Sequence, residues 1–125
     1  MTSETPDITA GINGLQSAFS AADTLLSTMD GHDRDDSSYW KAVATIPLAA
    51  LLYTVSPAGG GGGLAEARRI AAETDDTTRW SQVAASCAES LLADAVRRML
   101  ELQPRQRESV QRVIRDALTN PDAEA

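Results

Sequence analysis

The sequence has two features whose residue types suggest chemistry: a run of five glycines, Gly59 to Gly63, and a lone histidine in an acidic stretch. Glycine-rich P-loops bind phosphates through the pattern GxxxxGK[ST], in which a Lys neutralises charge and a hydroxyl binds magnesium. Leu64, Ala65 and Glu66 follow this run instead. A Rossmann turn would follow a strand, whereas a helix is predicted before the glycines. We therefore interpret residues 56–63 as a flexible connection between two helices.

The lone histidine, His32, lies among aspartates in "DGHDRDD", residues 30–36. Imidazole and carboxylate groups are common metal ligands, but the Gly and Glu of an EF-hand loop are not in their places. A solvated acidic loop is the favoured interpretation. One loop histidine does not make a Ser-His-Asp triad, and Cys87, the only cysteine, falls on an apolar helix stripe as a small core residue. The sequence therefore predicts no catalytic residue, no cofactor and no metal site, and we do not expect an enzyme.

Charge offers a stronger functional lead. The net charge is −7, which argues against a generic DNA-binding domain. Arginines nevertheless gather near the C-terminus and aspartates near residue 35. A solvated helix end that favours positive charge would also account for the arginines. The candidate surface for a partner or DNA comprises Arg97, Arg98, Arg105, Arg107, Arg112 and Arg115, and the candidate acidic surface comprises Asp33, Asp35 and Asp36.

The elements that would position these residues are all helical. Alanine, the strongest helix former, contributes 21 residues, and no alternation typical of strands is present. With ten Arg and one Lys, this composition is typical of high-GC, for example actinobacterial, genomes. Pro47 should kink its helix near Val43. We predict a compact all-α bundle of about five to seven helices, with helices over residues 8–29, 37–55, 64–74, 79–102 and 105–118.

Two of these helices have a clear apolar stripe. In the second helix the stripe comprises Trp40, Val43, Ala44, Pro47, Leu48, Leu51, Leu52 and Val55, and in the fourth it comprises Trp80, Val83, Ala84, Cys87, Leu91, Ala95, Met99 and Leu102. Pro104 marks a corner that favours the start of the last helix, and "NPDAEA", residues 120–125, ends that helix.

The predicted bundle is a single domain over residues 8–120, with a flexible lead-in (1–7) and a flexible tail (121–125). Its longest apolar region, Val43 to Val55, is shorter than the roughly 20 residues that span a bilayer. No signal-peptide pattern is present, and a single cysteine suits a reducing compartment. A cytoplasmic location is therefore expected.

Two segments resemble a known family. "YWKAVATIPLAALLY", residues 39–53, resembles the "FW…A…A…L..LL" helix in the all-α domain of type IV secretion coupling proteins. "RQRESVQRVIRDALTNPDAE", residues 105–124, is similar to the Arg-rich closing helix of that domain, and "GGLAEARRIAAE", residues 62–73, has a counterpart between them. The matching positions in the closing helix are Arg107, Ser109, Val110, Leu118 and Pro121.

The resemblance covers roughly residues 8–124. Coupling proteins are membrane-tethered, RecA-like hexameric ATPases of conjugation and effector export, and the all-α domain is inserted into the ATPase core at its cytoplasmic end. The phosphate loop, catalytic acid and membrane helices of the family are absent from this sequence. The resemblance thus implies an excised domain or a stand-alone relative, with ATPase activity only in a full-length parent at the cytoplasmic face of the plasma membrane.

Substrate recognition is the role that the resemblance implies. In this family the all-α domain selects cargo, namely a relaxase, an accessory factor or an effector, and in some members it contacts DNA. The first hypothesis is therefore a cargo-recruitment domain for conjugative DNA transfer, which would also contact the rest of the ATPase in a longer chain. The second is a DNA-binding domain that uses the C-terminal arginines. The third is a small helical adaptor, similar to an antitoxin and unrelated to secretion.

Overall fold

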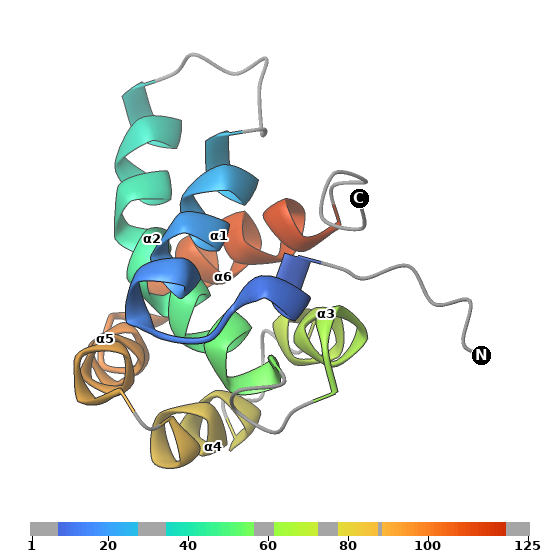
Figure 1. Ribbon diagram of the computed structural model, residues 1–125. Coiled ribbons are helices and arrows are strands. Elements are labelled where there is room, and N and C mark those ends of the chain that lie inside the picture. Colours follow the sequence, from blue (N-terminus) through green and yellow to red (C-terminus); the bar gives the residue numbers. More distant parts are fainter. Residues whose placement is uncertain (1–7, 28–34, 57–61, 73–77, 88, 120–125) are drawn as a thin grey trace.

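The computed structural model describes residues 8–27, 35–56, 62–72, 78–87 and 89–119, with the side chains of residues 35–42 outside this description. All regular structure in these segments is helical, which confirms the predicted all-α bundle (Figure 1). None of the described helices is long and apolar enough to cross a membrane. The elements are a 3-10 helix, η1 (Ile8–Gly11), and the α-helices α1 (Leu15–Ser27), α2 (Asp35–Val55), α3 (Leu64–Ala72), α4 (Thr78–Ser86), α5 (Ser90–Leu100) and α6 (Pro104–Leu118).

Helix α2 forms the centre of the bundle and contacts each of the other five α-helices (Figure 1). Six consecutive residues, 47–52, are buried. The predicted apolar stripe of this helix did not include Ala49 and Ala50, yet both are fully buried because other helices cover α2 on several sides. The helix continues through Pro47 without a break. An apolar, Ala-rich sequence therefore becomes the axis around which the other helices pack.

The first α-helix begins at Leu15, so the prediction of a helix from Ile8 is wrong over its first turns. The chain forms η1 and then breaks before α1. Ser17 stabilises the break, because its hydroxyl oxygen accepts hydrogen bonds from the backbone N–H groups of Asn13 (2.9 Å) and Gly14 (3.1 Å). These are among the N–H groups that a helix start leaves without a partner. A local side-chain cap thus overrides the apolar period.

The predicted helix over residues 79–102 is also wrong as a single element, because it is divided into α4 and α5. The hydroxyl of Ser86 donates to the carbonyl of Gln82 (2.6 Å), and Glu89 has an extended backbone. Such local bonds compete with helix continuation. The break changes which residues of α5 face the core: Leu92 is buried, whereas Leu91, which the predicted stripe placed inside, is 51% exposed.

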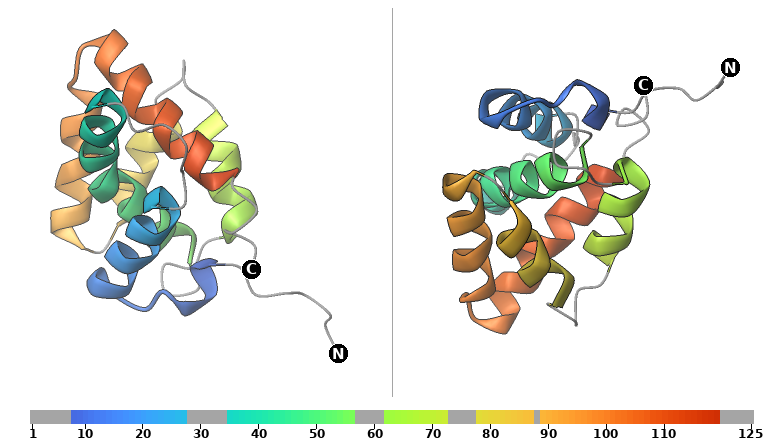
Figure 2. Two further views of the ribbon diagram at one scale, coloured as in Figure 1. Left: turned by 90° about the horizontal axis from the view of Figure 1, so that it is seen from above. Right: turned by 60° about the horizontal axis from the view of Figure 1, so that its bottom comes forward.

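Helices α3 and α6 lie side by side, as both views in Figure 2 show. The side chain of Arg68 joins them, because its Nε donates to the carbonyl oxygen of Leu118 at 2.7 Å. This carbonyl is at the end of α6, where no helical donor follows. Pro104 begins α6, close to the start predicted from the Pro104 corner.

The described end of the glycine run closes the connection between α2 and α3. The N–H of Gly63 donates to the carbonyl of Val55 at 2.7 Å, and the N–H of Gly62 donates to the carboxylate of Glu66. Gly63 has a φ of 80°, a backbone conformation that favours glycine. The last two glycines therefore belong to a helix–helix connection, as predicted, while the flexibility of residues 56–63 stays a prediction.

Replacing Gly63 with Ala is expected to lower the free energy of unfolding by about 1–2 kcal/mol, the cost of a left-handed conformation for an L side chain. Gly11→Ala is the control, since a Cβ there meets no atom within 4 Å and its φ is not positive. That variant should be neutral or stabilising by up to about 1 kcal/mol. Urea denaturation followed by circular dichroism would measure both, and equal effects would contradict the prediction.

Candidate functional site

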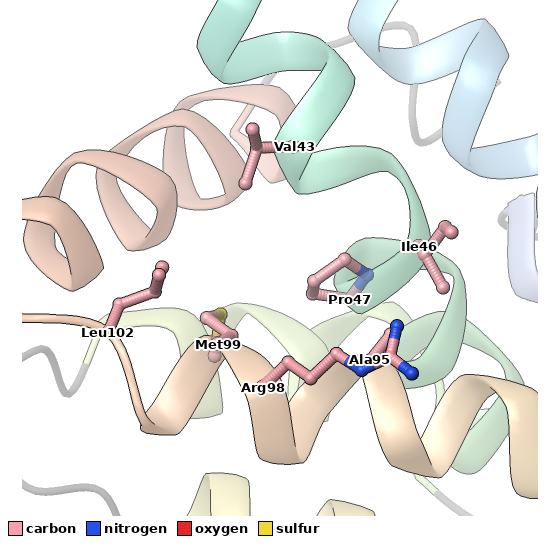
Figure 3. A pocket seen from close by; sticks show the side chains of 7 residues that line it. All are labelled: Val43, Ile46, Pro47, Ala95, Arg98, Met99 and Leu102. Atoms are coloured by element: carbon pink, nitrogen blue, oxygen red, sulfur yellow. The ribbon is translucent and has the colours of Figure 1, made fainter.

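An open pocket of about 210 Å³ lies between α2 and α5 (Figure 3). Helical spacing brings the lining residues together, because positions three, four and seven apart share one face of a helix. Six of the seven side chains are apolar. Helix α2 contributes Val43, Ile46 and Pro47, helix α5 contributes Ala95, Arg98 and Met99, and Leu102 follows α5.

The size and lining of the pocket restrict what it can bind. Sites for drug-sized ligands and cofactors enclose about 300–1,000 Å³, so a pocket of about 210 Å³ is better matched to a single side chain. Pro47 has no N–H and cannot donate the usual helical hydrogen bond to the carbonyl of Val43, one turn earlier. The small side chain of Ala95 on the opposite wall leaves room between the helices.

Arg98 is the only charged residue of the pocket lining, and its side chain lies along the same face as the apolar residues (Figure 3). No carboxylate in the described segments forms an ion pair with it. The preceding arginine differs, because Arg97 Nη1 lies 3.0 Å from Asp94 Oδ1, with both side chains 56% exposed. Arg98 thus places a positive charge beside an apolar pocket.

The structure does not place all six predicted arginines on one exposed face. Arg105 and Arg112 are exposed and lie seven residues apart, on the outer face of α6. Arg107 is half-buried, and at about 100° per residue it lies about 200° around the helix from Arg105. Arg115 is half-buried, with its Nε 3.9 Å from Asp116 Oδ1. The predicted binding role of these residues stays a prediction.

Other candidates from the sequence fall in different places. Asp33 and His32 lie outside the described residues. Asp35 and Asp36 begin α2, so the prediction that they belong to an acidic loop before a helix at residue 37 is wrong, and only their backbone is described. Cys87 is half-buried and packs against the core, but it follows the end of α4, so its predicted place on a helix stripe is wrong. Within the described segments, no three His, Cys, Asp or Glu side chains gather where they could hold a metal ion.

Sequence reasoning missed the pocket, although it identified several of its residues. Met99 was placed on an apolar stripe and Arg98 among the arginines, but nothing local shows that they face Pro47. The available signal was the helical spacing of Ala95, Arg98, Met99 and Leu102, which predicts one face with an arginine among apolar residues. The pairing of that face with α2 arises only in the tertiary structure.

The inner face of α6 carries an unusual polar residue. Gln111 is fully buried, and neither its Oε1 nor its Nε2 has a hydrogen-bond partner within the described segments. Arg107, one turn earlier on α6, has a buried Nε that also has no partner there. Buried polar atoms without a partner typically cost about 1–3 kcal/mol each. An amide left without partners at Gln111 would weaken the core on its side of α6.

We expect Gln111→Leu to raise the free energy of unfolding by about 1–2 kcal/mol, because it replaces an unpaired buried amide with an apolar side chain of similar length. Chemical denaturation of both proteins would measure the change. Gln106→Leu is the matched control, since Gln106 is exposed on the same helix and should change stability by less than about 0.5 kcal/mol. A destabilised Gln111→Leu variant would show that the amide is paired in the native protein.

Comparisons with protein-family models, with curated proteins and with solved structures found no match. The resemblance to coupling proteins therefore stays a prediction from the sequence.

Proposed function

We propose that this chain is a protein-recruitment domain that binds a segment of a partner protein through the α2/α5 pocket. The observation that carries the proposal is the open apolar pocket with Arg98 beside it. Peptide-recognition domains commonly combine apolar pockets for anchor side chains with charged groups that select the partner. The family resemblance supplies the setting, in which the partner is the cargo of a type IV secretion coupling protein: a relaxase, an accessory factor or an effector.

The residues of the resemblance support a scaffold role for α2. The matching residues Ala44, Leu48, Leu51 and Leu52 are all fully buried. Residues of this kind maintain the shape of a domain, and binding is left to its surface. The resemblance and the pocket are therefore complementary parts of the proposal, because the buried residues of α2 hold the bundle together while the half-buried Val43 and Ile46 line the pocket.

DNA binding is the second candidate, and Arg105 and Arg112 favour it because both are exposed on one face of α6. Two phosphate contacts would give a slope of about −1.4 to −1.8 in log K against log salt. The overall net charge of −7 opposes such binding. The apolar pocket would have no role in contacts to phosphates, so we place protein recruitment first.

The proposal can be tested by immobilising the purified chain and measuring binding of a purified relaxase and accessory protein encoded beside its gene. Saturable binding to either protein is expected. Fluorescence anisotropy with single- and double-stranded DNA, from 50 to 200 mM salt, would test the alternative. Binding to DNA alone, lost in the Arg105→Ala/Arg112→Ala double variant, would replace recruitment with DNA binding. No binding to either would favour an adaptor unrelated to secretion.

A further inference from the structure

We infer that the α2/α5 pocket receives one apolar side chain from an acidic partner segment, and that a carboxylate next to this side chain pairs with Arg98. The inference rests on the proposed recruitment function and specifies the chemistry of the partner. It commits to a peptide segment in which a residue such as leucine is flanked by Asp or Glu. Two observations carry it: the dimensions and lining of the pocket, and the charge beside it.

The pocket selects an apolar side chain rather than a polar one. Six lining side chains are hydrocarbon or thioether groups, and the about 210 Å³ between them suits one side chain of leucine size or somewhat larger. Met99 has a flexible side chain and Ile46 is only half-buried, so both can adjust to the shape of the inserted side chain. An inserted side chain would lose water contact on several sides, which is the source of affinity in anchor pockets.

The charge selects an acidic neighbour for that side chain. Arg98 is exposed and forms no ion pair within the described segments, while Arg97 beside it is already paired with Asp94. A guanidinium group binds a carboxylate through two parallel hydrogen bonds, and an occupant that excludes water strengthens such a pair. A basic segment would instead meet a like charge at the edge of the pocket.

The first test uses Met99 as a reporter. The chain has three methionines, so labelling with ¹³C-methyl methionine gives three signals, and that of Met99 is identified by its loss in Met99→Leu. The probes are capped peptides with a central leucine flanked by glutamates, the same peptide with lysines, and the glutamate peptide with alanine at the centre. We expect the Met99 signal to shift with the first peptide, with an affinity about tenfold higher than for the other two.

Four variants sharpen the test. Arg98→Glu should reverse the preference, so that the lysine peptide binds more tightly, and Arg97→Glu is its matched control because Arg97 is absent from the lining. Ala95→Leu should fill the pocket and abolish the shift, and Ala85→Leu, on the exposed face of α4, should not. Thermal unfolding confirms that each variant is folded.

Several outcomes would overturn the inference: no Met99 shift at millimolar peptide, equal shifts with the glutamate and lysine peptides, or unchanged binding in Ala95→Leu. A Met99 signal that shifts with protein concentration alone would assign the pocket to a second copy of the chain. Cargo binding that survives Ala95→Leu would leave recruitment standing and remove this pocket from it. Peptide binding without cargo binding would keep the pocket as a site for an acidic segment and would contradict the proposed recruitment function.

Discussion

Trp80→Ala is expected to lower the free energy of unfolding by about 3–5 kcal/mol, the usual cost of truncating a large buried aromatic residue. Trp80 has no exposed surface and is the largest fully buried side chain in the described segments. It lies on α4, which packs against α2 and α5. Its removal would leave a cavity in the hydrophobic core. Small domains have about 5–15 kcal/mol of stability in total, so this loss is severe.

Urea denaturation followed by far-ultraviolet circular dichroism would measure the change, because the signal reports the helices of the described segments together. Trp80→Phe is the matched control, since it keeps an aromatic ring and removes an indole Nε1 that has no hydrogen-bond partner within the described part of the chain. Its loss should be clearly smaller than that of Trp80→Ala. If Trp80→Ala cost less than about 1 kcal/mol, the position of α4 against the core would be wrong.

Local patterns in the sequence predicted the helical class and most of the helices. Helix α6 follows a clear apolar period between Pro104 and the asparagine-proline pair that ends the predicted segment, and the structure has it at Pro104–Leu118. The burial of Val110 and Ile114 also agrees with that period. Strong periodicity and clear breakers are local properties, so a sequence is sufficient to find them.

The two largest boundary errors, at the start of α1 and between α4 and α5, have a common physical cause. At Ser17 and at Ser86, a hydroxyl forms short-range hydrogen bonds with nearby backbone groups where the apolar period would continue a helix. Serine occurs often in helices as well, so its presence alone does not predict a break. The consequence at α5 is larger than a shifted boundary, because the break places Leu92 rather than Leu91 in the core.

The pocket was beyond sequence prediction for a different reason. The residues of its two walls that are nearest in sequence, Pro47 and Ala95, are 48 residues apart. No local pattern indicates that α2 and α5 are neighbours. That Arg98 has no ion-pair partner among the described residues also depends on the fold, since Arg97 and Arg98 look equivalent in the sequence. Their different surroundings arise from the direction of each side chain on α5.

Leu48→Ala is expected to lower the free energy of unfolding by about 2–5 kcal/mol. Leu48 is fully buried on the central helix and matches a leucine of the coupling-protein pattern. The neighbouring residues on α2, Ala49 and Ala50, are small and buried, so they cannot fill the space that the leucine leaves. Leu48→Met, which keeps most of the volume, should cost less than about 1.5 kcal/mol.

This experiment separates two meanings of the family resemblance. If Leu48 is a packing residue, Leu48→Ala loses stability, whereas Leu91→Ala, at a 51% exposed leucine, changes it by less than about 0.5 kcal/mol. If both variants were equally stable, Leu48 would lie on the surface, and the matching pattern would describe a contact with a partner. The buried position of Leu48 supports the first outcome. Under the proposed recruitment function, buried leucines such as Leu48 would maintain the scaffold, and exposed residues such as Arg98 would select the partner.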